Sequence, residues 1–442
     1  MKKKSRFAPS PTGLLHVGNT RSALLNWAYI NKKGGEFVLR IDDTDLKRSS
    51  KEFEDKIKSN LSWLGINWSK TINQSDRYSI YETKIEYLKK NKFIYPCFET
   101  TEELSLKRKS QLSSGKPPIY DRSSLNLTSN KIENFLKNGK KPHWRFKLKD
   151  QKIEWLDLIK GNISFDSKNL SDPILIREDG SLLYHLPSVI DDIEENITDI
   201  IRGEDHLTNT AFHIQIFESF NAKIPNFGHH PFLIDQEGKG FSKRLGSLSI
   251  EFLINQGFES ISILNYLLTI GSNKNISKEK DIKKLIDDFE ISNIATSSPK
   301  FSVDVLKILN KEILQSYSFQ EIQKKFENFE VNEKFWIFVK NNIDFFHESF
   351  EWLKIISSSK VHESNSKELL KIAAELIPEE PYNESTWDQW VKLIMKNTEK
   401  KGKDLFLPLR IALTGREKGP ELKHLMPLMT KNQILKKLGY IK

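Results

Sequence analysis

The stretch that decides the fold runs from residue 6 to residue 19 and reads Arg6-Phe7-Ala8-Pro9-Ser10-Pro11-Thr12-Gly13-Leu14-Leu15-His16-Val17-Gly18-Asn19. It predicts a short strand, a rigid Pro/Gly turn, and a helix that begins near His16 and Gly18. The free N–H groups and the dipole of a helix start attract phosphate. Gly18 lets a nucleotide lie close to the backbone, and His16 can donate to a phosphate oxygen. The pattern is compatible with a nucleotide site, but on this element alone a capped helix with a buried histidine, which uses the same residues, is the more frequent case.

The segments next to this stretch alternate as they do in α/β nucleotide-binding folds. Short apolar runs bounded by turn residues predict strands at about 5–8 and 36–41, with a helix at about 18–33 between them. Apolar residues at helical spacing predict two further helices, at 51–64 and 77–91.

The regular alternation stops after Pro96 and resumes near residue 183, so the part between is interpreted as an insertion. A strand near 199–202 and a helix at 208–220 follow it, and the two flanking parts are therefore expected to form one sheet. Helical spacing predominates from Ile250 onward.

The composition excludes several classes of protein. A chain of 442 residues is long enough for several domains that each bury a core. Its single cysteine, Cys97, excludes internal disulfides and any zinc site built from several cysteines. No window approaches 18 uninterrupted apolar residues, and prolines interrupt the basic start. We expect a cytoplasmic protein without a membrane span.

Positive charge is concentrated at one end of the chain. Lys and Arg exceed Asp and Glu by 69 − 59 = 10 overall, and by 12 − 4 = 8 within residues 396–442. This concentration indicates a polyanionic partner such as nucleic acid. A solvated helical face remains the alternative on charge alone.

A second informative segment is a basic loop flanked by glycines, Gly238-Lys239-Gly240-Phe241-Ser242-Lys243-Arg244-Leu245-Gly246. Glycines permit closure, and a lysine is a point charge that suits a triphosphate. Alone, such a loop is more often a basic turn. A His-x-Gly helix start followed by a Ser-Lys loop is, however, the bipartite signature of class I aminoacyl-tRNA synthetases.

The chain resembles the glutamyl-tRNA synthetases of that class. The stretch 6–19 is similar to their HIGH motif and 241–244 to their KMSKS loop. Further segments match the family in order and spacing: 39–45 (LRIDDTD), 183–186 (LYHL), 201–206 (IRGEDH) and, more weakly, 407–415 (LPLRIALTG).

The resemblance implies a role for each matching residue. His16 and Lys243 would stabilise the α-phosphate and the departing pyrophosphate, with Mg²⁺ accompanying ATP. The ATP-binding set is His16, Gly18, Asn19, Ser242 and Lys243. The glutamate-binding set is Arg6, Ala8, Ser10, Asp42, Tyr184 and Arg202, and two arginines suit a carboxylate. Thr44 and Asp45 would lie near the terminal adenosine of the tRNA.

The implied fold is a Rossmann-like α/β catalytic domain of the HUP type with an inserted α+β acceptor-binding domain, followed by all-α connecting and anticodon-binding domains. The expected limits are 1–96 and 183–250 for the catalytic halves, 97–182 for the insertion, 251–310 for the helical stem-contact region and 311–442 for the anticodon-binding domain.

The implied reaction activates L-glutamate with ATP and transfers it to the 3'-terminal adenosine of tRNA(Glu), and tRNA(Gln) is left open as a second acceptor. A monomer is expected. The alternative is a catalytically impaired tRNA-binding paralogue, because Gly240 replaces the first lysine of the KMSKS loop. Asp42 is one methylene shorter than the usual glutamate, and Cys97 alone does not make the zinc knuckle of some relatives, so no zinc is expected.

Other suggestive residues are interpreted without a role in chemistry. The acidic run Asp191-Asp192 and Glu194-Glu195 is expected to be an exposed loop rather than a metal or acid/base pair. His229 and His230 are expected to be structural. The tryptophans Trp336, Trp352, Trp387 and Trp390 are expected in a helical core, with an exposed member as a possible stacking surface for a base.

Overall fold

The computed structural model describes residues 2–240, 248–327, 329–362 and 366–441 of the chain. The chain divides into two compact units. The first, called here the catalytic unit, comprises residues 1–254 and 263–302. The second, called the helical unit, comprises 255–262 and 303–442. The predicted limits of the five segments stay predictions.

The catalytic unit is built on a parallel sheet of five strands in the order β10-β9-β1-β2-β3. The strands are β1 Lys4–Phe7, β2 Glu36–Ile41, β3 Lys70–Asn73, β9 Asp199–Gly203 and β10 Asn226–His230. Three strands precede the insertion and two follow it, which confirms that the flanking parts form one sheet.

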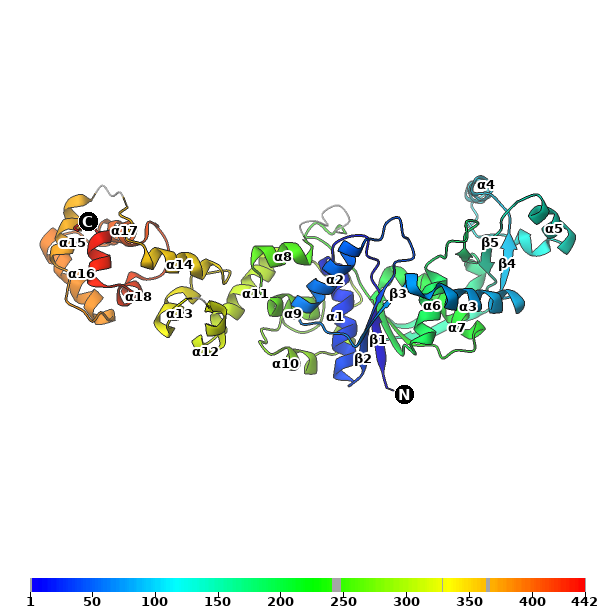
Figure 1. The fold of residues 1–442 in the computed structure, drawn as a ribbon, viewed down its shortest axis with the longest axis horizontal. Helices are drawn as coiled ribbons and strands as arrows, with labels where there is room; N and C mark the ends of the chain where they lie inside the picture. Colours follow the sequence, from blue (N-terminus) through cyan, green and yellow to red (C-terminus); the bar gives the residue numbers. More distant parts are fainter. Residues whose placement is uncertain (1, 241–247, 328, 363–365, 442) are drawn as a thin grey trace. The chain divides into compact units, whose positions relative to one another are not determined.

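Helices cover this sheet. Helix α1 (Val17–Lys32) lies alongside β1 and β2 in Figure 1, and its residues Leu24, Trp27 and Ile30 are buried. Helix α2 (Lys51–Trp63) begins at a serine cap, because the Ser50 hydroxyl accepts from the Phe53 N–H at 3.2 Å. Helices α3 (Tyr78–Lys90), α6 (His185–Glu194) and α7 (Leu207–Ser219) complete the layers.

The inserted segment is a small α+β structure. Strands β4 (Ile94–Cys97), β5 (His143–Phe146) and β8 (Ile174–Ile176) form an antiparallel sheet in the order β4-β5-β8. Helices α4 (Thr101–Ser113) and α5 (Ser129–Lys137) lie between β4 and β5 in the sequence. Each has a threonine cap, which explains where it begins.

A hairpin of β6 (Lys152–Asp157) and β7 (Gly161–Asp166) brings the insertion back to the central sheet. Just after β6, the Leu158 N–H donates to the carbonyl of Phe227 in β10 at 2.8 Å. A shared apolar core that includes Tyr81, Phe146 and Ile200 joins the insertion to its flanks. This contact places Asp157, at the end of β6, against the strand end that carries His229.

The last three α-helices of the catalytic unit are α8 (Ile250–Gln256), α9 (Ser260–Thr269) and α10 (Ile282–Asp287). The last residues of α8 and the first residues of α9 are assigned to the helical unit. The buried Arg21 of α1 donates to the carbonyls of Pro231 at 3.2 Å and Ile270 at 2.8 Å. These bonds hold the end of α9 against the helix that begins at His16.

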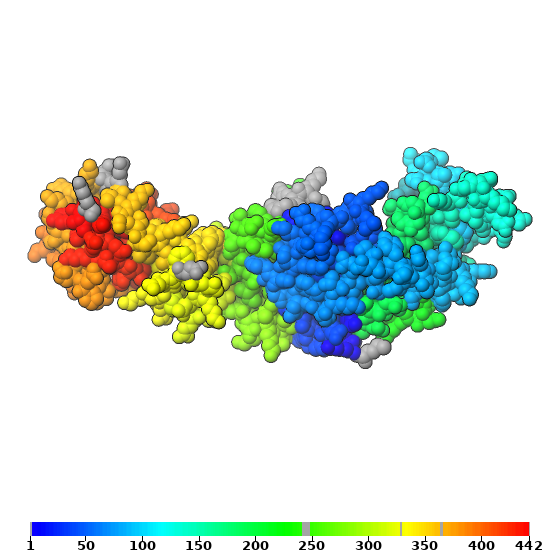
Figure 2. Space-filling view, in the orientation of Figure 1, coloured from blue at the N-terminus to red at the C-terminus, as the bar shows by residue number. Residues whose placement is uncertain are grey.

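The described part of the helical unit has helices and no strands, as predicted. Its helices are α11 (Val303–Ser316), α12 (Phe319–Ile322), α13 (Glu333–Lys340), α14 (Glu348–Ser357), α15 (Lys367–Glu375), α16 (Glu384–Thr398), α17 (Lys403–Thr414), α18 (Leu422–Leu425) and α19 (Lys431–Lys437). Figure 2 shows the later helices, in orange and red, gathered into one lobe. No helix in the described ranges is both long and apolar enough to cross a membrane.

The core of the helical unit is apolar and aromatic. The four predicted tryptophans Trp336, Trp352, Trp387 and Trp390 are buried in it, which confirms their assignment to the core. None of them is exposed for stacking on a base. The Trp390 indole donates to the carbonyl of Ala373 at 2.9 Å, so its polar atom is satisfied inside the core.

Candidate active site

A cavity of about 410 Å³ opens at the carboxyl ends of the parallel strands. Strand β1 pairs with β2 on one side and with β9 on the other. The chain adds β2 and β3 on the first side and later adds β9 and β10 on the second. Such a switch point leaves a crevice outside the strand ends, where ligands of open α/β sheets bind. Nine residues predicted for the site line this cavity: Arg6, Ala8, Ser10, His16, Gly18, Asn19, Asp42, Tyr184 and Arg202.

The other four predicted site residues fall into two pairs. Ser242 and Lys243 lie outside the described residues. Thr44 and Asp45 follow β2, and the Asp45 carboxylate accepts from the Arg48 Nε at 2.7 Å. The neighbouring Asp43 anchors this segment through the N–H and the hydroxyl of Ser75, at 2.8 and 2.7 Å.

His16 caps helix α1 with its own ring. Nδ1 accepts from the N–H groups of Gly18 at 3.1 Å and Asn19 at 3.4 Å. Burial lowers the pKa of His16, so the ring is neutral and its proton lies on Nε2. No described residue accepts from Nε2, which lets it donate to a ligand. The helix cap that was an alternative to the nucleotide site is present, and it leaves the donor free.

Gly18 suits this cap. A Cβ at Gly18 would approach the His16 ring to 3.0 Å at Cε1 and 3.1 Å at Nδ1. The ring would have to shift by a few tenths of an ångström to admit a side chain there. The His-x-Gly pattern is therefore explained by the contact of the two residues as well as by access to the backbone.

Arg6, which lines the cavity, and the buried Arg40, which does not, are both paired with carboxylates of the chain. Asp192 accepts from Arg6 Nε at 3.0 Å and from Arg40 Nη1 at 2.9 Å. Arg40 also donates to both oxygens of Asp42, at 2.7 and 3.2 Å. Burial raises the pKa of Asp42, and the Arg40 guanidinium opposes that shift. The charges of Arg6 and Arg40 are thus balanced within the protein.

The prediction that the Asp191 to Glu195 run is an exposed loop is wrong. Asp191 and Asp192 lie on helix α6 and are only 1% exposed. Asp191 accepts from Gln74, Arg77 and Tyr81, at 2.7, 2.7 and 2.9 Å. A buried carboxylate needs such partners. They come from distant segments, so the local acidic pattern could not indicate burial.

Arg202, at the end of β9, has no carboxylate partner among the described residues. Its Nη1 donates to the Tyr184 hydroxyl at 2.9 Å and its Nη2 to the Thr210 hydroxyl at 2.6 Å. Nε is buried without an acceptor in the described part of the chain. Burial lowers the pKa of this guanidinium. Arg202 is 5% exposed and lines the cavity, so the wall carries a buried cation that no described carboxylate contacts directly, although Asp192 and Asp205 act on it from a distance.

Several histidines surround Arg202 without adding charge. Burial, with Arg202 as a second cause, lowers the pKa of His185 to about 4 and of His206 to about 3. His213 is fully buried and its pKa is also lowered by burial. These rings are neutral at pH 7, so they add no positive charge to that of the guanidinium. His229 and His230 are buried and hydrogen-bonded within the chain, as predicted.

The sequence did not single out Thr210 or Asp157, and it indicated His229 only as a structural histidine. Thr210 lies eight residues after Arg202 and faces it across the turn from β9 to α7. His229 and Asp157, which continue the contact, come from β10 and β6. No local spacing connects these three positions, so only the fold could bring them together.

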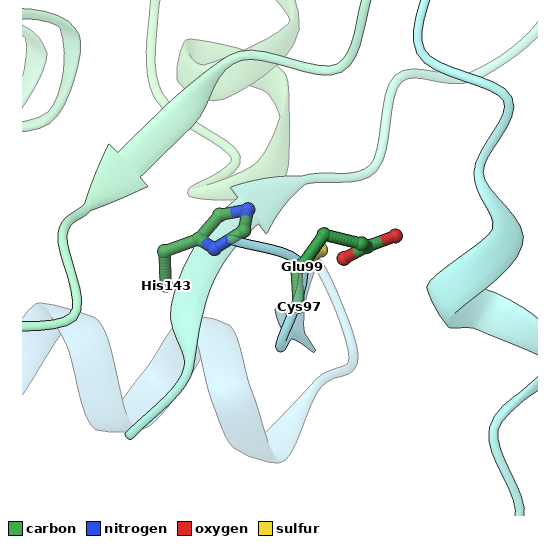
Figure 3. A group of neighbouring side chains, drawn as sticks. All are labelled: Cys97, Glu99 and His143. Carbon is green, nitrogen blue, oxygen red and sulfur yellow. The ribbon is translucent and has the colours of Figure 1, made fainter. Parts of the chain in front are cut away.

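A separate group in the inserted segment has metal-binding atoms close together. Cys97, Glu99 and His143 each offer one such atom, all within 4.8 Å of one another. In Figure 3 His143 lies on one strand opposite Cys97 on its neighbour, in agreement with the β4–β5 register.

This group fits a metal ion poorly. The Glu99 oxygens already accept from the hydroxyls of Tyr120 at 2.7 Å, Ser123 at 3.0 Å and Ser124 at 2.8 Å. Burial raises the pKa of the Cys97 thiol to about 11, which opposes the thiolate form that binds metal. The expectation of no protein-bound zinc stays a prediction.

Comparison with known proteins shows the family. Residues 2–316 match the family described as tRNA synthetases class I (E and Q), catalytic domain, and residues 303–441 match the anticodon binding domain family. The chain is 45% identical to glutamate–tRNA ligase 1 of Rickettsia bellii and 46% identical to glutamate–tRNA ligase 2 of Rickettsia canadensis, each over 98% of this chain and 99% of the relative.

A solved structure gives the same result. The crystal structure of a glutamate tRNA ligase from Elizabethkingia meningosepticum, in complex with its amino acid, matches with a TM-score of 0.86 at 25% identity and covers 99% of both chains. The predicted fold class, with a Rossmann-like sheet and a helical C-terminal part, is confirmed. The motifs quoted from 6–19 to 201–206 surround a single cavity in a chain that belongs to the glutamyl-tRNA synthetase family of class I.

Proposed function

We propose that this protein is a glutamate–tRNA ligase that activates L-glutamate with ATP and transfers it to the 3'-terminal adenosine of tRNA(Glu). The observation that carries the proposal is Arg202, a buried cation at the cavity wall without a carboxylate partner in the described residues. The side-chain carboxylate of glutamate supplies the missing charge. Glutamine would leave the guanidinium buried and unpaired, which is strongly unfavourable.

Arg202 and Tyr184 hold the side-chain carboxylate, and Arg6 extends the same wall of the cavity. Arg6 contributes less charge, because Asp192 balances it at 3.0 Å. Ala8, Ser10 and Asp42 face the rest of the amino acid. Asp42 is already bonded to Arg40 through both oxygens, so it contacts the α-ammonium group through its remaining lone pairs or through water.

The first step needs no nucleophile from the protein. The α-carboxylate of glutamate attacks the α-phosphate of ATP, the bond to the β-phosphate oxygen breaks, and pyrophosphate leaves. His16 donates from Nε2 to a phosphate oxygen as negative charge builds up. Gly18 and Asn19 provide the helix start next to the nucleotide, and Lys243 with Ser242 adds a positive charge from the loop at 241–244.

In the second step a ribose hydroxyl of the terminal adenosine attacks the carbonyl of glutamyl-adenylate, and AMP leaves. Mg²⁺ accompanies ATP and neutralises charge on its phosphates. Asp42 is engaged with Arg40, so the phosphate oxygens are better ligands for that ion than this carboxylate. Thr44 and Asp45 follow the end of β2 and contact the terminal adenosine.

The helical unit binds the anticodon stem and loop, and its basic C-terminal part, 12 Lys or Arg against 4 acids in residues 396–442, provides affinity for phosphate. We propose a monomer that acts in the cytoplasm. Charging of tRNA(Gln) as a second acceptor is left to experiment, because no described residue decides between the two anticodons.

The test is ATP-dependent attachment of labelled glutamate to purified tRNA(Glu) and, separately, to tRNA(Gln). Wild-type protein is expected to charge tRNA(Glu), and Lys243→Ala to lose most of that activity. Wild-type protein that binds tRNA(Glu) in a filter assay but forms no glutamyl-tRNA would contradict the proposal and identify an impaired paralogue with Gly240 in the loop.

A further inference from the structure

A line of buried hydrogen bonds runs from Arg202 away from the cavity. Arg202 Nη2 donates to the Thr210 hydroxyl at 2.6 Å, and that hydroxyl lies 2.8 Å from His229 Nε2. His229 Nδ1 lies 2.5 Å from Asp157 Oδ2. The four residues come from β9, α7, β10 and β6, and each is at most 5% exposed. The line therefore joins the inserted hairpin to the cavity wall.

Asp157 is held as an ionised acceptor at the far end. Its Oδ1 accepts from the backbone N–H groups of Ile159, Lys160 and His229, each at 3.0 Å. Burial opposes ionisation, but the bonds from His229 and Lys160 outweigh it and lower the pKa of Asp157 to about 2. Asp157 can therefore only accept from His229.

This fixes the direction of every bond in the line. Burial lowers the pKa of His229, and the bond to Asp157 offsets this only in part, so the ring is neutral. Its single proton lies on Nδ1 toward Asp157, and Nε2 accepts. The Thr210 hydroxyl has two acceptors within reach, His229 Nε2 at 2.8 Å and the His206 carbonyl at 3.1 Å; it donates its one proton to the nearer of them, Nε2, and accepts from Arg202. Each proton thus points from Arg202 toward Asp157.

We propose that Asp157, His229 and Thr210 are positioning residues that hold the Arg202 guanidinium for selection of glutamate over glutamine. The inference rests on the proposed function, because it concerns the same cavity. Asp157 does not touch the guanidinium and acts on it only through His229 and Thr210. The guanidinium is therefore held in place and remains free to form an ion pair with the carboxylate of the ligand.

The sharpest test reverses the direction of hydrogen bonds in the line and keeps the shape of the side chain at position 157. In Asp157→Asn, the three backbone N–H groups fix the amide oxygen in the place of Oδ1, and the amide NH₂ faces His229. The amide then donates to Nδ1, so the ring proton moves to Nε2. The Thr210 hydroxyl must turn to its other acceptor, the His206 carbonyl at 3.1 Å, and its oxygen then receives protons from both His229 and Arg202.

The expected result is a KM for glutamate about 10- to 100-fold higher in charging assays, as for the loss of one hydrogen bond to a charged group. The preference for glutamate over glutamine in kcat/KM falls with it, and the KM for ATP stays within about twofold, because the line does not reach the nucleotide side. Asp172→Asn is the matched control. Asp172 is another buried aspartate of the insertion, bonded to Tyr95 and Arg122. Its substitution should leave the KM for glutamate and the preference for glutamate over glutamine unchanged.

A second pair of variants decides the matter if Asp157→Asn loosens the fold. Thr210→Val removes the acceptor for Arg202 and should raise the KM for glutamate, whereas Thr210→Ser keeps the hydroxyl and should restore it. Thermal unfolding is measured for all variants. The inference would be overturned if wild-type protein charges tRNA but Thr210→Val and Thr210→Ser have the same KM for glutamate and the same preference for glutamate over glutamine. Wild-type protein that charges no glutamate would instead contradict the proposed function.

Discussion

The two compact units bury different kinds of side chain. In the described residues of the catalytic unit, arginines, aspartates and histidines are buried together, among them Arg6, Arg40, Arg202, Asp192 and His213. In the described residues of the helical unit, Lys437 is the buried charged residue, and the core is otherwise apolar and aromatic with a few small polar side chains. The difference follows the work that each unit is proposed to do.

Burying a charge is costly unless it is paired, so a unit that needs only a stable shape avoids it. The helical unit keeps its charge on the surface, where it can meet phosphate groups. The catalytic unit buries charges despite this free-energy cost, because they must contact a small charged ligand in a site that excludes water. Arg202, which forms no ion pair with a described carboxylate, marks the place where the charge of the ligand is expected.

The largest expected effect is a loss of stability in the apolar core of the helical unit. Trp390→Ala should lower the free energy of unfolding of the helical unit by about 3–5 kcal/mol, because it leaves a cavity in the aromatic core. Trp390 is 0% exposed, whereas Leu393 on the same helix is 44% exposed. Leu393→Ala is the control and should change stability by less than about 1 kcal/mol. Chemical denaturation with tryptophan fluorescence measures both, and equal losses would contradict the assignment of the core.

The next effect concerns catalysis in the polar unit. His16→Asn should reduce kcat by about 10²–10³-fold, the loss expected when one donor to the developing charge is removed. Asparagine keeps the helix cap, because its side-chain oxygen can accept from the N–H groups that His16 Nδ1 now accepts. The rate of glutamate activation in the presence of tRNA measures the effect. A variant with unchanged kcat would show that Nε2 does not donate to the phosphate.

Acid should weaken the catalytic unit through its neutral histidines. Burial lowers the pKa of His143 to about 4, whereas an unfolded histidine titrates near 6.5. Between these values the unfolded chain binds a proton and the folded chain does not, so stability falls as pH falls. The contribution is at most about 1.4 kcal/mol per pH unit for this one group. Urea denaturation at pH 7, 6 and 5 should give a smaller loss for His143→Gln than for wild type.

The last effect belongs to the helical unit and to alkaline pH, and it has the same sign as the effect of His143, because stability again rises as pH rises. Burial lowers the pKa of Lys437 to about 8, and its Nζ donates to the carbonyl of Ile355 at 2.7 Å. As pH rises from about 8 to 10.5 the unfolded chain holds more protons than the folded one, so stability rises, by at most about 1.4 kcal/mol per pH unit. Lys437→Met should abolish this rise. A variant with the same alkaline profile as wild type would exclude Lys437 as its cause.

The sequence predicted the elements whose signals are local. The strand expected at 36–41 is β2, Glu36–Ile41, and the helix expected at 18–33 is α1, Val17–Lys32, within one residue at each end. Apolar runs and turn residues lie next to each other in these cases. Nine of the described residues that line the cavity were also identified from motifs, although their roles remain proposals.

The remainder depends on contacts between distant segments. Asp192 looks like a surface acid in the sequence, but Arg6 and Arg40 reach it from strands more than 150 residues earlier, at separations of 186 and 152 residues. Thr210, His229 and Asp157 likewise carry no common motif. Inside the insertion, short strands and loops gave no clear period, so its β4-β5-β8 order could only come from the structure.

The most direct test of the central claim is the ratio of kcat/KM for glutamate to that for glutamine in charging of tRNA(Glu), measured for wild type and Arg202→Gln. The account predicts a strong preference for glutamate in wild type and a fall of that ratio by about 10²–10³-fold in the variant, as for the loss of one partner of a buried charge pair. The same ratio in both proteins would contradict the claim that the unpaired charge of Arg202 selects the amino acid.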